Sequence, residues 1–273
     1  MSIKYTHRWL ALLLLPLLLM ACVAGPSAND AVRQALAPTG TLRIGVYPGS
    51  PTSMVKDAKT GEVRGVSVEV GKELARRLHV PYELVEYPLI ADVINGMRVK
   101  AVDFTISNST PERAKEIDFT QPVLAVESGY LVPAGSAIAT FADIDQPGVR
   151  VGVSQGSTSF TILSRDLKHA SLVQAPNVQS AIDMLMQHKV DAYATNKGIL
   201  YQMSDSLPGS RVLEGRWNLE YMSMAVPKGR DQGVDYLHKL VDDPDIQKLV
   251  AQAAQRAGLR GTVSVKTISV ETR

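Results

Sequence analysis

VSVEVGKELARRLHVPYELVEYPLIADVINGMRVKAVDFTI, residues 66–106, alternates between two kinds of hydrophobic pattern. Residues 66–80 and 89–99 carry apolar side chains at helical spacing with polar side chains between them, which predicts two helices. Residues 82–87 and 101–106 are short runs with the length and composition of strands. This helix-strand-helix-strand order predicts a parallel sheet with helices packed on its faces.

The same order of elements occurs twice along the chain. A strand at 42–46 precedes the first round, and a second round follows without any repeat of the sequence itself, which predicts two similar α/β lobes. Extended segments at 122–133 and 219–228 would join the lobes, and a helix over about 231–257 would complete the first lobe. The second round consists of strands at 149–153, 171–175 and 190–195 and helices at 157–167 and 178–188.

Composition places the chain among ordinary globular proteins. Its 273 residues are 45% hydrophobic and 21% charged, so there is enough apolar surface to bury a core. Lys4 and Arg8 account for the formal net charge of +2, because the rest of the chain carries equal numbers of basic and acidic side chains. This balance predicts no nucleic-acid partner.

Residues 1–22 have the pattern of an export signal: a basic start and then an apolar run at 10–20 that is short for a permanent membrane span. The run ends in Leu-Met-Ala-Cys, which resembles the lipobox of bacterial lipoproteins. Cys22 is the only cysteine in the sequence, which favours its lipidation; the alternative is cleavage after Ala24. In either case we expect a periplasmic protein, in the first case one that is anchored to a membrane by its lipid.

Two segments are open to two interpretations. Residues 23–39 are small, polar and rich in Pro and Gly, which is typical of a tether, although a short stretch within them fits a loosely packed N-terminal helix. Residues 262–272 alternate in polarity and predict either a further strand or a tail.

Five motifs in sequence order resemble the signatures of the family 3 extracellular solute-binding proteins, the polar amino-acid receptors of bacterial ABC importers. The likeness runs from about Gly40 to Gly258. The motifs are TLRIGV (41–46), the helix start at Gly65, STPERAKEIDFTQP (109–122), VRVGVSQGSTS (149–159) and HKVDAYAT (188–195).

The resemblance implies a periplasmic-binding-protein type 2 fold, in which two doubly wound α/β lobes are joined by a two-segment hinge. On this basis we expect lobe 1 to comprise residues 40–128 and 223–273 and lobe 2 to comprise residues 129–222. The ligand would lie in the cleft between the lobes, since sites in such sheets lie beyond the carboxyl ends of the strands.

Arg113 is the first candidate for ligand binding. Thr110, Pro111 and Glu112 form a good helix start, so Arg113 lies one turn into a predicted helix. There its guanidinium can hold a carboxylate through two parallel hydrogen bonds, whereas an exposed pair with Glu116 fits the residues equally well. The resemblance implies carboxylate recognition, because the family's ligand-clamping arginine occupies this T-x-x-R position.

The resemblance adds candidates from both lobes. Asn108 stands where the family places a Ser or Thr that binds the same carboxylate, and Ile106 lies in the same loop. Ser157 and Thr158 lie between a strand and a helix, where they can cap the helix and can also bind an anion. Tyr47 is the nearest substitute for the family's stacking aromatic; the alternative is a Tyr on the surface at a strand end.

Asn196 departs from the family pattern. Amino-acid receptors of the family generally have Asp or Glu after the VDA strand, where the carboxylate pairs with the ligand's ammonium group. In this sequence Asn196 and Lys197 follow the strand instead. Asp191, within the strand, is expected to pack or pair beneath the sheet. An ammonium without a counter-charge in a closed cleft costs several kcal/mol. Asn196 is therefore a candidate contact that supplies no charge, and the sequence leaves recognition of an α-amino group open.

Other chemistry has little support in the sequence. The five histidines are scattered without metal-site spacing, and we predict no metal, cofactor or catalytic residue. The chain also resembles exported cyclohexadienyl dehydratases, but no carboxylate occurs between Asp191 and Asp205, where that reaction needs its acid.

We therefore predict a monomeric receptor, not an enzyme. Its expected partners are a small carboxylate-bearing solute and an ABC permease in the inner membrane. A ligand-sensing lipoprotein without a transport role is the remaining alternative.

Overall fold

The computed structural model describes residues 28–57 and 59–263. The predicted signal peptide at 1–22, with the Cys22 that is predicted to be lipidated, and the segment 264–273 lie outside the described residues. No helix in the described part of the chain is long and apolar enough to cross a membrane.

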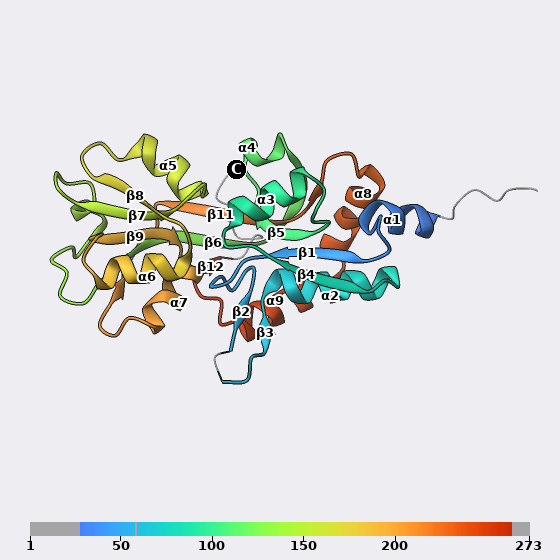
Figure 1. Cartoon of the computed structure of the whole chain (residues 1–273), viewed down its shortest axis with the longest axis horizontal. Helices are drawn as coiled ribbons and strands as arrows, with labels where there is room; N and C mark the ends of the chain where they lie inside the picture. The colour runs from blue at the N-terminus through green and yellow to red at the C-terminus, as the bar shows by residue number, and fades with distance from the viewer. Residues whose placement is uncertain (1–27, 58, 264–273) are drawn as a thin grey trace, which may run out of the picture.

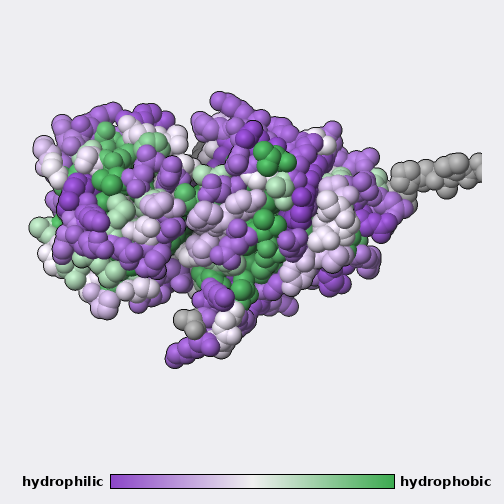
Figure 2. All heavy atoms as spheres, viewed as in Figure 1, coloured by the Kyte–Doolittle hydropathy of each residue, from purple (hydrophilic) through white to green (hydrophobic). Residues whose placement is uncertain are grey.

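Two α/β halves lie side by side along the long axis of the molecule, and the strands β6 and β11 enter both of them (Figure 1). A groove runs between the halves on the face shown in Figure 2. This arrangement agrees with the predicted two-lobed α/β fold. The helices are α1 (Ala28–Leu36), α2 (Val66–Leu78), α3 (Ile90–Arg98), α4 (Pro111–Ala114), α5 (Thr158–Asp166), α6 (Val178–Met186), α7 (Lys197–Asp205), α8 (Asp231–Val241), α9 (Pro244–Arg256) and the 3-10 helix η1 (Phe141–Asp143). The strands are β1 (Leu42–Val46), β2 (Val55–Lys56), β3 (Val63–Arg64), β4 (Tyr82–Glu86), β5 (Thr105–Asn108), β6 (Ile117–Val132), β7 (Arg150–Ser154), β8 (Ser171–Ala175), β9 (Ala192–Asn196), β10 (Arg211–Val212), β11 (Asn218–Pro227) and β12 (Thr262–Val263).

One sheet passes through both halves, with the strand order β5-β11-β6-β9-β7-β8. In the first half β1 pairs with β4 in parallel and joins the sheet through a bridge between Ile44 and Phe104. In the second half β7 pairs in parallel with β8 and β9. β6 pairs with β11 from Ile117 to Ser128 and with β9 from Ser128 to Leu131, so this single strand belongs to both halves.

The N-terminal segment differs from the predicted tether. Within 23–39, residues 28–36 form α1, whose last residue, Leu36, is fully buried. Leu36 packs so closely on α8 that a Cβ built on Gly233 would lie 2.6 Å from its side chain, and its carbonyl accepts a hydrogen bond from Arg230. Ala37 is also buried in this core and Val32 packs against it, so from Ala28 onward the helix interpretation is confirmed and the tether interpretation is wrong.

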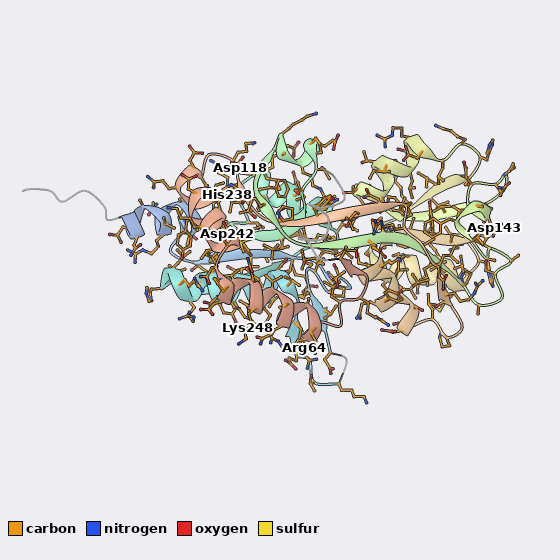
Figure 3. All side chains as sticks on the ribbon, turned by 180° about the vertical axis from the view of Figure 1, so that it is seen from behind. Arg64, Asp118, Asp143, His238, Asp242 and Lys248 are labelled. Carbon is orange, nitrogen blue, oxygen red and sulfur yellow. The ribbon has the colours of Figure 1, made fainter. Side chains whose placement is uncertain are left out.

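The C-terminal segment also differs in detail from expectation. The helix expected over 231–257 is two helices, because Asp243 caps a new helix and Pro244 occupies its first turn. Thr262 and Val263 form β12 against β6. The hairpin of β2 and β3, which carries Arg64, and the helix α7 were not predicted; Figure 3 shows Arg64 on the first half and Asp143 at the far end of the second.

Each half is tied together by the same arginine–aspartate clamp. Arg43 of β1 donates to Asp103 through Nε and Nη2, both at 2.8 Å. Arg150 of β7 donates to Asp191 through the same atoms, at 3.0 and 2.9 Å. In both clamps the Nη2 atom also donates to the backbone carbonyl three residues before the aspartate. The pairing expected for Asp191 is thus confirmed, and the clamp is repeated in the first half.

The two clamps differ in their burial. Asp103 is fully buried and accepts a further hydrogen bond from Arg230 Nη2 at 2.7 Å. The side chains of Arg150 and Asp191 are 42% and 34% exposed. Buried charges depend on their partners far more than exposed ones do, so we expect the first clamp to matter more for stability.

Asp103→Ala should lower the free energy of unfolding by about 3–5 kcal/mol, because it leaves the buried Arg230 guanidinium without its carboxylate. Asp191→Ala, the matched variant in the exposed clamp, should lower it by about 1 kcal/mol or less. Urea unfolding of both variants measures the difference. Equal losses would show that burial does not set the strength of the clamps.

Candidate functional site

A cavity lies between the two halves, beside the strands that join them. It encloses about 40 Å³, well below the roughly 150 Å³ of a protein cavity that admits benzene. All seven residues that the sequence predicts as ligand contacts line this cavity, and they come from both halves. They are Tyr47, Ile106, Asn108 and Arg113 from the first half and Ser157, Thr158 and Asn196 from the second. The structure brings these residues together, and their binding roles stay predictions.

The two halves touch each other around the cavity. Asn108 Nδ2 on β5 donates to Thr158 Oγ1 on α5 at 3.4 Å. A Cβ built on Gly156 would lie 2.7 Å from the Cβ of Ala91 on α3, so the backbones approach closely there. A hydrophobic cluster also continues across the groove from one half to the other. The structure is therefore closed over the cavity.

Arg113 lies on α4, a single turn that begins after Thr110 as the sequence predicts. Its Nη1 donates to Ser107 Oγ at 2.9 Å and to the Asn108 carbonyl at 3.2 Å, and Thr110 Oγ1 accepts from its backbone N–H. Among the described residues Nε and Nη2 have no hydrogen-bond partner, and the exposed pair with Glu116 does not form. Two donors of one guanidinium thus remain available at the cavity wall.

Asn108 and the start of α5 face each other across the cavity. Asn108 Oδ1 accepts from the Tyr221 N–H at 3.0 Å, which fixes the orientation of the amide. Ser157 Oγ accepts from the Phe160 N–H at 3.2 Å and caps α5. The contact from Asn108 Nδ2 to Thr158 is long for a hydrogen bond, so this N–H can turn to a solute oxygen.

Tyr47 and Ile106 form part of the wall of the cavity. Tyr47 is 9% exposed and its hydroxyl donates to Ser50 Oγ at 3.2 Å, so the alternative of a surface tyrosine is wrong. Ile106 is 2% exposed in the core of the first half. Its backbone N–H donates to Ser67 Oγ and its carbonyl accepts from the same hydroxyl, which leaves it an apolar role at the cavity.

One acidic residue that the sequence analysis did not select also lines the cavity. Glu220 of β11 is 6% exposed, and its Oε2 accepts from Asn196 Nδ2 at 3.2 Å. It forms no ion pair with any residue that the structure describes. Ser128 Oγ, buried on the neighbouring strand, helps to stabilise the carboxylate although its geometry falls short of a hydrogen bond. The cavity therefore contains a carboxylate, that of Glu220, next to the neutral amide of Asn196.

Burial dominates the electrostatics of the cavity. It raises the pKa of Glu220 above the ordinary value of 4.5, and the positive charge of Arg113 opposes this shift. Burial likewise lowers the pKa of Arg113, and the negative charge of Glu220 opposes that shift. Two opposite charges thus share the cavity and influence each other without forming an ion pair.

The cavity offers hydrogen bonds and two charges but no cluster of metal ligands. Within the described residues, no group of three or more His, Cys, Asp or Glu side chains is placed to hold a metal ion. Hydroxyl groups that the sequence analysis did not select complete the wall, and one of them, Ser159 Oγ, is buried without a partner among the described residues. These hydroxyls belong to Thr52, Ser107, Ser154, Ser159 and Thr195.

Known proteins resemble the chain over most of its length. The family model for bacterial extracellular solute-binding proteins, family 3, matches residues 42–257. A glutamine-binding protein of Geobacillus stearothermophilus is 23% identical over 235 residues, which cover 78% of this chain and 89% of that protein.

Two solved structures share the fold. The solute receptor for L-cysteine of Neisseria gonorrhoeae superposes with a TM-score of 0.73 at 24% identity, covering 82% of this chain and 92% of that one. The ancestral amino acid-binding protein AncCDT-1, a precursor of cyclohexadienyl dehydratase, superposes with a TM-score of 0.70 at 23% identity, covering 82% and 98%.

Glu220→Gln should raise the thermal unfolding temperature of the unliganded protein at pH 8 by a few degrees. This shift corresponds to a gain on the order of 1 kcal/mol in the free energy of unfolding. Because folding raises the pKa of Glu220, the stability that the protonated carboxyl provides is present below about pH 4.5 and is lost as the pH rises through the raised value. The advantage of the variant should therefore shrink as the pH falls to 4.5 and below.

Glu127→Gln is the matched control for this pH series. Glu127 lies on β6 and pairs with Lys197 at 2.7 Å, and the ion pair lowers its pKa. Its replacement should destabilise the protein at pH 8 and matter less in acid, which is the opposite sign. If Glu220→Gln behaves like Glu127→Gln, the carboxylate of Glu220 is well compensated in the unliganded state.

Proposed function

The chain belongs to the bacterial extracellular solute-binding proteins, family 3, and on that premise we propose that it is an extracytoplasmic receptor of an ABC importer. It binds a small carboxylate-bearing solute, an amino acid or an amino-acid-like molecule, in the cavity between its halves. The relatives whose names mention glutamine and L-cysteine support the amino-acid class.

The observation that carries the proposal is the state of Arg113. This guanidinium lines the cavity between the halves, is oriented by Ser107 and the Asn108 carbonyl, and keeps Nε and Nη2 free of partners among the described residues. Adjacent N–H donors of one guanidinium match the two oxygens of a carboxylate. Ser157 and Thr158 approach from the second half with hydroxyls and the N-terminus of α5, which adds donors for the same oxygens.

Ligand binding and closure are one event in this proposal. The lobes comprise residues 40–128 with 223–273 and residues 129–222, and they hinge where β6 and β11 cross between them, near Gly129 and Met222. The register shift of β11 after Met222 supports a bend at this point. A solute that contacts both halves binds the closed form more tightly and so shifts the population towards it.

The receptor works outside the cytoplasm as a monomer in this proposal. Cys22 carries the lipid that anchors it to a membrane, and a permease in the inner membrane accepts the solute from it. The cavity of about 40 Å³ favours a solute with a small side chain, because a larger one requires the halves to move apart.

Catalysis is a second candidate, and one observation favours it. Glu220 is a buried acid with a raised pKa in the cavity, so a proton donor is present even though none occurs between Asp191 and Asp205. A receptor returns its solute unchanged, whereas an enzyme does not. Incubating the bound solute with the protein and recovering it for NMR analysis distinguishes the two, and a sensor without transport would behave as the receptor does.

Arg113→Ala should weaken binding of the tightest amino acid about a hundredfold or more, since loss of one partner of a buried charge pair costs about 2–5 kcal/mol. Arg113→Lys keeps the charge without the paired donors and should restore only part of the affinity. Isothermal titration with the twenty amino acids and their 2-hydroxy analogues measures both effects.

Arg98→Ala, a change of an exposed arginine on α3, is the control and should leave binding unaltered. Thermal unfolding of the unliganded variants checks that each is folded. Wild-type affinity in a folded Arg113→Ala protein would refute the assignment.

A further inference from the structure

We propose that Glu220 is the specificity-determining residue of the cavity and binds the ammonium group of a zwitterionic solute whose carboxylate is held by Arg113. The inference rests on the proposed receptor function and names the class of solute: an α-amino acid with a free amino group, in preference to a hydroxy acid or another plain carboxylate.

The position of Glu220 replaces a charge that β9 lacks. Asn196 ends β9 and supplies an amide, and this amide donates to Glu220 Oε2 at 3.2 Å. The carboxylate on β11 therefore stands one hydrogen bond away from the end of β9. Because Asn196 also caps α7 through its Oδ1, its own position and that of the carboxylate are fixed together.

The cost of burying Glu220 argues for a ligand-dependent role. A carboxylate that is 6% exposed and has no ion-pair partner among the described residues is unfavourable in the unliganded protein. The buried aspartate of the first half shows how this chain stabilises a structural carboxylate: Asp103 has two arginines bound directly to it. Glu220 has no such arrangement, and a solute ammonium in the cavity would provide the missing counter-charge.

The charge balance of the cavity predicts which solute is preferred, an amino acid or a hydroxy acid. Arg113 and Glu220 are the charged side chains that line it, and together they sum to zero when both are ionised. A zwitterion keeps this balance, with each end next to the opposite charge. A hydroxy acid has the same carboxylate but no ammonium, so it leaves the cavity with a net negative charge and Glu220 without a counter-charge, and it is disfavoured.

The test compares pairs of solutes that differ only in the α-substituent. Glycine with glycolate, L-alanine with L-lactate, L-glutamate with L-2-hydroxyglutarate and L-phenylalanine with L-phenyllactate span small, acidic and large side chains. Isothermal titration of each pair is done with the wild type, Glu220→Gln and the control Glu127→Gln. The control also removes one negative charge, but from β6, where Glu127 forms an ion pair with Lys197.

We expect the wild type and Glu127→Gln to prefer the amino member of a bound pair by about a hundredfold or more. Glu220→Gln should lose that preference, with weaker binding of the amino acid and equal or tighter binding of the hydroxy acid. An equal preference in Glu220→Gln, or no preference in the wild type, would overturn this inference and leave the carboxylate receptor intact. Failure of every amino and hydroxy acid to bind the wild type would instead overturn the proposed function itself.

A second variant moves the charge without losing the hydrogen bond. Glu220→Gln combined with Asn196→Asp places the amide on β11 and the carboxylate on β9, the family's usual arrangement. This double variant should recover at least a tenth of the wild-type affinity for the bound amino acid. Recovery shows that the negative charge, and not the shape of the Glu220 side chain, sets the preference; a double variant as weak as Glu220→Gln alone would contradict the proposal.

Discussion

The cost of burying charge is the constraint on which the rest of the structure depends. Outside the cavity the chain meets it with direct pairs: Asp103 is held by Arg43 and Arg230. At the cavity Arg113 is half-buried and Glu220 is buried, yet neither has an ion-pair partner among the described residues. The fold thus satisfies its structural charges and leaves two opposite ones unsatisfied in the space between its halves, which is the arrangement expected of a site that waits for a solute.

Sequence patterns predicted the two α/β halves, and the family resemblance predicted the hinge that joins them. Alternating strand and helix periods predicted β1, α2, β4 and α3, and then β7, α5, β8, α6 and β9, in the correct order, because strands and amphipathic helices leave distinct spacings. Two differences have local causes. The choice between a tether and a helix for α1 stayed open because its stability comes from docking on α8, which the sequence does not show, and the last long helix was not divided although Asp243 and Pro244 begin a new helix.

Site residues that lie in local sequence motifs could be predicted, whereas a residue that strand pairing brings to the site could not. Arg113, Ser157 and Asn196 lie at or just after strand ends within short motifs, and the resemblance of these motifs to those of the family selected them. Glu220 lies in the middle of β11, where a single acid between apolar residues has no motif around it. The sequence did hold one indication of its role. Glu220 shares a strand face with Met222, which also lines the cavity, and an acid is rare on a buried strand face unless it binds something. Only the pairing of β11 with β5 and β6, and of β6 with β9, shows that this face is the cavity wall.

The balance of charge around the cavity has a kinetic consequence. The cavity-lining side chains contributed by β7, α5, α6, β9 and α7 are hydroxyls, amides or aliphatic groups, and the ionised groups, Arg113 on α4 and Glu220 on β11, cancel each other. A zwitterionic solute also carries no net charge, so long-range attraction contributes little to its encounter with the cavity. Capture and release therefore depend on short-range contacts, and ionic strength should change their rates little.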